Sequence, residues 1–147
     1  MKVFVTGGTG FVGNHVLSTL VEKGHQVVAL VRPGSEKKLK KPDGIEVVTG
    51  DVTEIVDLTQ GMKGCDAVIH LVGIIRSFAS KGITFERLHT EATANVIAAA
   101  KETGISRLLH MSALGAREDG STPYLRTKFA AEELVRQSGL SYSIFRP

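Results

Sequence analysis

The chain has 147 residues, 42% of them hydrophobic and 22% charged, which predicts one globular domain with a sizeable core. The net charge of +3 is too small to indicate nucleic-acid binding by itself, and the single cysteine excludes an internal disulfide and a cysteine-cluster metal site. No apolar run reaches membrane-spanning length and the amino terminus enters a strand at once, so we expect a cytoplasmic protein.

The first expected strand, 2–5, leads into a glycine-rich turn at 6–13 (TGGTGFVG), and a helical pattern follows. Gly8, Gly10 and Gly13 fit the spacing G-x-G-x-x-G, whereas Gly7, Gly10 and Gly13 fit G-x-x-G-x-x-G. A glycine turn between strand and helix lets a pyrophosphate approach the backbone and meet the free N–H groups of the helix. The sequence therefore predicts a dinucleotide-binding turn; a glycine turn without a ligand is the alternative.

Strand-like and helix-like segments alternate along the rest of the chain. The further strands are expected at 26–31, 45–49, 67–72, 107–111 and 141–145, and the further helices at 54–60, 84–103 and 124–137. This alternation predicts an α/β fold with a doubly wound parallel sheet, the Rossmann architecture, over residues 1–147. The expected strand order is 3-2-1-4-5-6, with a ligand at the carboxyl ends of the strands.

The second strand ends at Arg32 with no acidic residue at its tip. An acid there would bind the ribose 2′-hydroxyl of NAD, whereas an arginine accommodates the 2′-phosphate of NADP, so the sequence favours NADP over NAD. The lysines in 37–41 would add attraction, although a solvated loop is the alternative interpretation. Asp51, after the third strand, is expected either to bind the adenine amino group or to cap the helix that begins near Thr53.

Tyr124 and Lys128 lie four residues apart at the start of a helix and share one face, and Ser112 follows the fifth strand. A neighbouring ammonium and a cationic nicotinamide would favour the phenolate and make Tyr124 usable as an acid/base. Lys128 would tune its pKa and hold ribose hydroxyls, and Ser112 would donate a hydrogen bond to a substrate carbonyl.

Taken in order, these motifs resemble the landmarks of the short-chain dehydrogenase/reductase superfamily over essentially the whole chain. They are TGxxGxxG at 6–13, GDV at 50–52, HLVG at 70–73, MSALGA at 111–116, YxxxK at 124–128 and FRP at 145–147. More narrowly, the chain resembles the atypical branch of NAD(P)-binding, epimerase/dehydratase-like proteins, which includes the nucleotide-binding accessory subunit of respiratory complex I.

The resemblance implies specific site residues. For the cofactor they are Gly7, Thr9, Gly10, Phe11, Val12, Gly13, Arg32, Asp51, Val52, Leu71, Val72, Gly73 and Lys128; for catalysis they are Tyr124 and Lys128, and Ser112 joins this pair only through its place after the fifth strand. The glycines would bind pyrophosphate, Arg32 the adenosine phosphate, Asp51 and Val52 the adenine, and the residues at 71–73 the adenosine and ribose side.

The sequence also departs from the family pattern. Ala113 occupies the position of the usual catalytic Ser or Thr, and the asparagine often found in the helix after the fourth strand is missing near His89. Family members continue past the Arg-Pro that follows the sixth strand, so we expect the natural protein to extend beyond Pro147 into a substrate lobe. In this chain we expect either that a neighbouring molecule, such as a second copy in a homo-oligomer, covers the edge of the sixth strand, or that the chain is only marginally stable.

The sequence thus supports an NADP-dependent reductase or epimerase-like enzyme that transfers hydride between NADP(H) and a carbonyl, an alcohol or a sugar-nucleotide-like substrate. The alternative, favoured by Ala113, is a non-catalytic NADP(H)-binding subunit or redox sensor of an electron-transfer complex. RNA binding is supported only by the lysines in 37–41. The histidines show no metal-ligand spacing, and His70 and His110 are expected to be hydrogen-bonded core residues.

Overall fold

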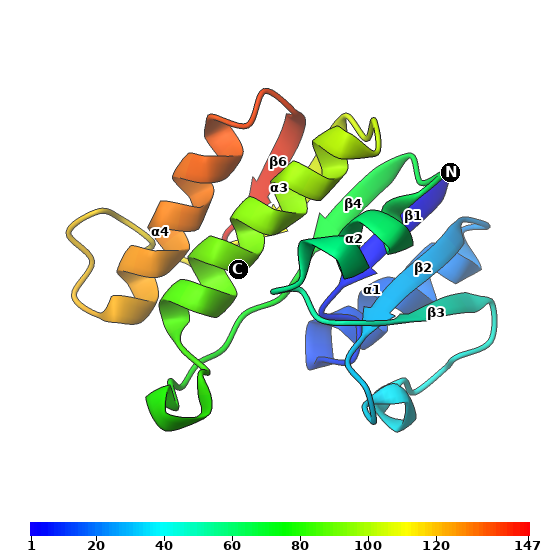
Figure 1. The fold of residues 1–147 in the computed structure, drawn as a ribbon, viewed down its shortest axis with the longest axis horizontal. Coiled ribbons are helices and arrows are strands. Elements are labelled where there is room, and N and C mark those ends of the chain that lie inside the picture. Colours follow the sequence, from blue (N-terminus) through cyan, green and yellow to red (C-terminus); the bar gives the residue numbers. More distant parts are fainter.

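The strands form one parallel sheet in the order β3-β2-β1-β4-β5-β6, as the sequence predicted, in a computed structural model that describes residues 1–147 (Figure 1). They are β1 (Lys2–Thr6), β2 (Gln26–Val31), β3 (Ile45–Thr49), β4 (Ala67–His70), β5 (Arg107–Met111) and β6 (Ser141–Phe145). From β1 the chain adds β2 and β3 on one side, and it then crosses back to add β4, β5 and β6 on the other side, so the strand order reverses between β1 and β4. This switch point is where parallel sheets of this type leave a crevice at the carboxyl ends of their strands.

The helices are α1 (Phe11–Glu22), α2 (Ile55–Met62), α3 (Ala92–Glu102) and α4 (Pro123–Arg136). Short helices lie at Glu36–Lys38, Ala79–Lys81 and Glu86–Glu91, the last with π-type hydrogen bonding. Local sequence defines the start of α4, because the Thr122 hydroxyl accepts a hydrogen bond from Leu125 N and Pro123 occupies the first turn. No helix is both long and apolar enough to cross a membrane.

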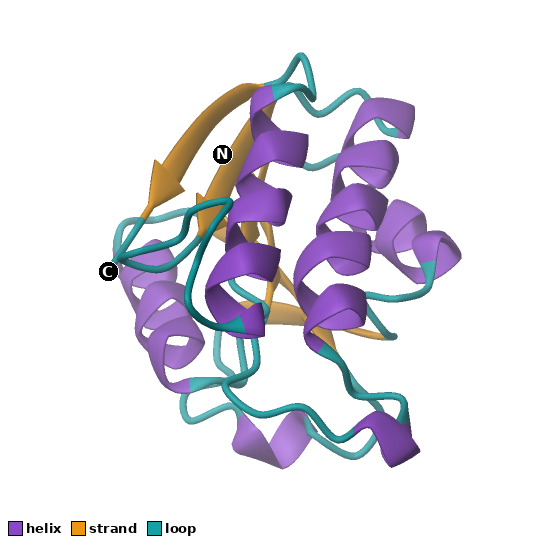
Figure 2. Cartoon of the chain, turned by 90° about the vertical axis from the view of Figure 1, so that its left-hand side faces the viewer, coloured by secondary structure: helices purple, strands orange, loops and turns teal.

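Helices α2, α3 and α4 cover one face of the sheet, and α1 lies on the other (Figure 2). This division follows from right-handed crossovers, because the chain moves toward β3 through α1 and toward β6 through α3 and α4. The larger core lies under α2 to α4 and includes Phe4, Val28, Leu58, Met62, Val68, Val96, Leu108 and Val135. The smaller core, under α1, includes Val3, Val5, Leu17, Val27, Val31 and Leu39.

On the α1 side, β4, β5 and β6 have no covering helix. An apolar groove of about 490 Å³ runs there, lined mainly by Val12, Val16, Ile69, Leu71, Leu109, Met111 and Phe145. The half of the sheet near β6 is therefore a two-layer structure.

Most element boundaries differ from the sequence prediction by no more than two residues, and two of the differences have a clear structural cause. The strand expected at 67–72 ends at His70, because the backbone at Leu71 and Val72 turns across the glycine turn and packs against Gly7. The helix expected at 84–103 is divided into the π-helical turn Glu86–Glu91 and α3. Such π-helical turns are frequent at functional sites.

Candidate functional site

A cleft of about 240 Å³ lies at the switch point, between the carboxyl ends of β1, β2 and β4. Its walls are the glycine turn, the end of β2, the loop after β3 and the loop after β4. The lining residues are Thr6, Gly7, Thr9, Gly10, Leu30, Arg32, Asp51, Val52, Leu71, Val72, Gly73, Ile74 and Leu88.

The glycine turn is shaped by close backbone packing. Gly7 has φ of 75°, and a Cβ at this residue would lie 2.8 Å from the Leu71 carbonyl carbon; a Cβ at Gly13 would lie 2.1 Å from the Gly7 oxygen. Gly10 differs, since its nearest such neighbour is the Gly7 oxygen at 3.4 Å and it faces the cleft. Close packing therefore requires glycine at Gly7 and Gly13, whereas Gly10 between them leaves room for a ligand.

The amino terminus of α1 supplies the donors for that ligand. Gly10 is its N-cap, no side chain caps the first turn, and that turn contains no acidic residue. Free N–H groups and the positive end of the helix dipole favour an anion such as a pyrophosphate. The residues present thus fit the phosphates of a dinucleotide.

Arg32 and Asp51 line the other end of the cleft. Asp51 Oδ1 accepts hydrogen bonds from Thr53 N at 2.9 Å and Thr53 Oγ1 at 2.8 Å, which folds the turn before α2. The N-cap of α2 is Glu54 rather than Asp51. Asp51 therefore shapes the cleft wall without capping the helix, and its contact with adenine stays a prediction.

The structure gathers most of the predicted cofactor residues in this cleft. Those lining it are Gly7, Thr9, Gly10, Arg32, Asp51, Val52, Leu71, Val72 and Gly73. Phe11 and Val12 lie outside it, since the Phe11 side chain is 77% exposed and Val12 faces the apolar groove. The prediction missed Thr6, Leu30, Ile74 and Leu88, although Thr6 and Leu30 stand at the carboxyl ends of strands that flank the switch point.

Tyr124 and Lys128 lie on α4, and Lys128 reaches toward the far rim of the cleft. A Cβ at Gly73 would lie 3.7 Å from Lys128 Nζ, which donates a hydrogen bond to the Met111 carbonyl at 2.6 Å. Burial lowers the pKa of Lys128 to about 8, against the opposing effect of Glu132. The ammonium is thus held at the carboxyl edge of the sheet.

His89, in the π-helical turn, connects the cleft rim to α4. Its Nε2 accepts a hydrogen bond from Ile74 N at 3.1 Å. The neutral ring therefore carries its proton on Nδ1, which donates a hydrogen bond to Thr127 Oγ1 at 2.9 Å. Burial, reinforced by the Lys128 charge, lowers the pKa of His89 to about 4, so the ring is neutral at pH 7. The ring also packs edge-on against Tyr124, with centroids 5.3 Å apart. No sequence motif around His89 predicts that it bridges Ile74 and Thr127.

His70 and His110 differ from each other. His70 is a hydrogen-bonded core residue, as predicted, with Thr6 Oγ1 at 2.7 Å and Thr93 Oγ1 at 3.2 Å. For His110 the same prediction is wrong, since both ring nitrogens are buried without a hydrogen-bond partner. Its ring stacks on His70, and burial lowers its pKa to about 3, so it stays neutral.

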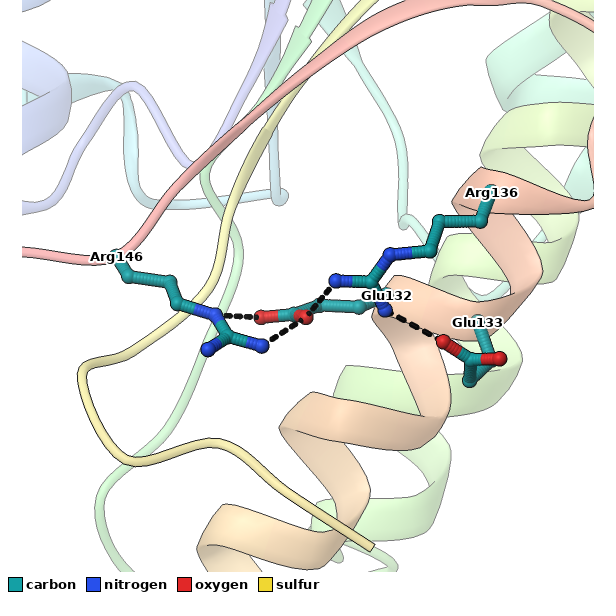
Figure 3. Close-up of polar contacts among 4 residues, drawn as sticks. All are labelled: Glu132, Glu133, Arg136 and Arg146. Atoms are coloured by element: carbon teal, nitrogen blue, oxygen red, sulfur yellow. Dashed lines mark hydrogen bonds and ion pairs between the residues drawn. The ribbon is translucent and has the colours of Figure 1, made fainter.

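Ser112 is 4% exposed, does not line the cleft, and its hydroxyl has no hydrogen-bond partner. It lies near the carboxylate of Glu132, which is clamped between Arg136 and Arg146 (Figure 3). The structure thus brings Tyr124 and Lys128 to one side of the site but leaves Ser112 buried. Its contact with a substrate carbonyl stays a prediction that this geometry does not favour.

Comparison with known proteins agrees with this geometry. Residues 7–147 match the family model described as NAD(P)H-binding. The chain is 33% identical to ceramide reductase from Caulobacter vibrioides, covering 99% of this chain and 45% of that protein. It is 30% identical to photosystem II assembly factor Ycf39 from Synechocystis, covering 99% and 44%. The crystal structure of a UDP-galactose 4-epimerase superposes with a TM-score of 0.80 at 25% identity, covering 99% and 55%.

The chain spans about half the length of the curated relatives it matches. The family match over residues 7–147 includes the Tyr124–Lys128 pair and strands β2 to β6.

Proposed function

Because the chain belongs to the NAD(P)H-binding family, among the epimerase/dehydratase-like short-chain dehydrogenases/reductases, we propose that it is an NADP(H)-dependent reductase or epimerase-like enzyme. Its substrate would be a carbonyl compound, an alcohol or a sugar-nucleotide-like molecule. The observation that carries the proposal is the continuity of the cleft, which runs from Arg32 past the glycine turn to Gly73, beside Lys128.

The preference for NADP rests on the end of β2. Arg32 is exposed at the cleft, and the strand residues before it, Leu30 and Val31, are apolar, so the end of β2 carries no carboxylate that would repel a 2′-phosphate. A guanidinium binds phosphate through two parallel hydrogen bonds, whereas an acid would repel it. Gly7, Gly10 and the start of α1 would hold the pyrophosphate.

The chemistry assigned to the chain's own residues is positioning and proton transfer. When bound, the nicotinamide would supply hydride exchange with a carbonyl or alcohol carbon. Tyr124 would hold or release the proton on the substrate oxygen, and the nearby Lys128 ammonium would stabilise the phenolate. Lys128 is anchored for this role by Met111 O.

Direct binding tests the cofactor assignment. We expect the protein to bind NADPH more tightly than NADH, and Arg32→Ala to remove most of that difference. Lys63→Ala is the matched control. This exposed lysine follows α2 and precedes the amino end of β4, whereas the cleft lies at the carboxyl ends of the strands. A wild-type preference for NADH would overturn the assignment.

Turnover of a carbonyl panel tests the catalytic assignment. Tyr124→Phe should abolish turnover and keep NADPH affinity, whereas Tyr142→Phe, on exposed β6, should change neither. Turnover that survives in Tyr124→Phe would show that this phenol is not the acid/base.

The second candidate function is a non-catalytic NADP(H)-binding or assembly role. It is favoured by the buried Ser112 beside Ala113 and by the similarity to an assembly factor. On this alternative, NADPH binding persists, no panel compound turns over, and Tyr124→Phe leaves every measurable property unchanged.

A further inference from the structure

Asn14, in the first turn of α1, makes three hydrogen bonds with its side-chain amide. Nδ2 donates to Gly10 O at 3.0 Å and to Lys38 O at 3.2 Å, and Oδ1 accepts from Lys40 N at 2.8 Å. The residue is only 8% exposed. A small amide in this position joins two parts of the chain that are 24 to 26 residues apart.

The segment that Asn14 holds is basic and lies on the surface. Lys37, Lys38 and Lys40 are exposed, while Leu39 between them is 7% exposed and packs in the core under α1. At the other end, Ser35 N donates to Arg32 O at 3.0 Å. The backbone from 35 to 40 is therefore fixed at three points, although it contains only one short helical turn.

The bond to Gly10 O fixes the Asn14 amide at the glycine turn, and the bonds to Lys38 O and Lys40 N place the segment against it. Gly10 is the N-cap of α1 and lines the cleft, and Arg32 lines the same cleft. Asn14 thus ties the lysine-bearing backbone to the first turn of α1, and the bond from Ser35 N ties its other end to Arg32. Exposed charges are screened over about 10 Å at 0.1 M salt, so lysines act on a phosphate only when they are held near it.

We propose that Asn14 is a positioning residue for cofactor selection: it fixes Lys37, Lys38 and Lys40 beside Arg32, so that the site favours a ligand with a 2′-phosphate. The proposal rests on the cleft binding a dinucleotide, as proposed above. It adds a residue that touches neither the phosphate nor the lysine side chains and acts through their backbone.

The test compares NADPH and NADH affinities for matched variants of the protein. Asn14→Ala is expected to weaken NADPH binding about fivefold and NADH binding less than twofold, because only NADPH carries the 2′-phosphate charge. The double variant Lys37→Ala/Lys38→Ala should show the same selective loss. The control double variant Lys23→Ala/Lys63→Ala removes equal charge from exposed positions at the far ends of α1 and α2, and should change neither affinity.

A double-mutant cycle separates positioning from a general loss of structure. If Asn14 acts through the lysines, adding Asn14→Ala to the lysine double variant causes little further loss of NADPH affinity. Equal losses for NADPH and NADH, or fully additive losses, would overturn the proposal. If Asn14→Ala does not fold, Asn14→Ser serves in its place, since its hydroxyl can bond Gly10 O but is too short to bridge to Lys38 and Lys40.

The same data distinguish the two proposals. A wild type without preference for NADPH refutes the NADP assignment itself. A wild type that prefers NADPH, with that preference unchanged in the Asn14 variant, refutes the role of Asn14 alone.

Discussion

Both carboxylate oxygens of Glu132 accept hydrogen bonds from the guanidinium group of Arg146. Arg146 Nε lies 2.8 Å from Oε1 and Nη2 lies 2.6 Å from Oε2, while Arg136 Nη2 approaches Oε2 at 2.7 Å from the other side (Figure 3). The Glu132 side chain is completely buried, whereas both arginines remain partly exposed. The pair fastens the chain after β6 to α4, the helix that carries Tyr124 and Lys128.

Removing the charge of Glu132 should destabilise the fold. Glu132→Gln breaks the two-point contact with Arg146, and we expect a loss of roughly 2 kcal/mol in the free energy of unfolding, measured with urea. The matched variant is Glu133→Gln, because Glu133 is partly exposed and pairs only with Arg136. It should cost less than about 0.5 kcal/mol. Equal losses in the two variants would contradict the role assigned to Glu132.

The buried Glu132 carboxylate should also make the free energy of unfolding depend on pH in the acid range. Burial alone would raise the pKa of Glu132, but hydrogen bonds from the guanidinium groups of Arg146 and Arg136 outweigh it and lower the pKa from 4.5 to about 2. A lowered folded-state pKa gives stability that is present above pH 4.5 and lost as the pH falls toward 2. The stability gap between wild type and Glu132→Gln should therefore narrow across that range. A gap that stays constant would contradict this assignment.

The two glycines of the phosphate turn should respond differently to alanine. Gly13→Ala places a Cβ 2.1 Å from the Gly7 oxygen, so we expect a loss of stability of roughly 3 kcal/mol. Gly10 has φ of −76°, and a Cβ there would meet only the Gly7 oxygen, at 3.4 Å, so Gly10→Ala should keep the fold within about 0.5 kcal/mol. It should nevertheless abolish NADPH binding, because the methyl group occupies the approach of the pyrophosphate. Thermal melts with and without NADPH measure both effects, and full NADPH binding by Gly10→Ala would show that the phosphates lie elsewhere.

Lys128 should make stability rise with pH in the alkaline range. Because burial lowers its pKa from 10.5 to about 8, the unfolded chain binds this proton more tightly than the folded one. Wild-type stability should therefore increase relative to Lys128→Met as the pH rises from 8 to 10.5. Urea midpoints of the two proteins at pH 7, 9 and 10.5 give the comparison. A difference that does not change with pH would mean that Lys128 is charged and solvated like a surface lysine.

The sequence was sufficient for the sheet and the glycine turn because both are local patterns. Apolar runs mark parallel strands, and the strand–glycine–helix order leaves few arrangements for Gly7, Gly10 and Gly13. The strand end at His70 was missed, because it depends on how the following backbone packs against Gly7.

The polar contacts that organise the site could not be found in the same way. His89 joins Ile74 to Thr127, and Asn14 joins Gly10 to Lys38, across separations that no single-sequence pattern encodes. A histidine or an asparagine in a helical segment is equally compatible with a solvated surface. These side chains find their hydrogen-bond partners only in the folded chain, where helices and loops that are distant in sequence meet near the carboxyl ends of the strands.

The apolar groove over β4, β5 and β6 has a consequence for the behaviour of the chain in solution. Side chains such as Leu109, Met111 and Phe145 meet water along a continuous strip instead of a helix. Sulfate and other excluded salts strengthen the burial of such surface, so these salts should promote association of the chain through this strip.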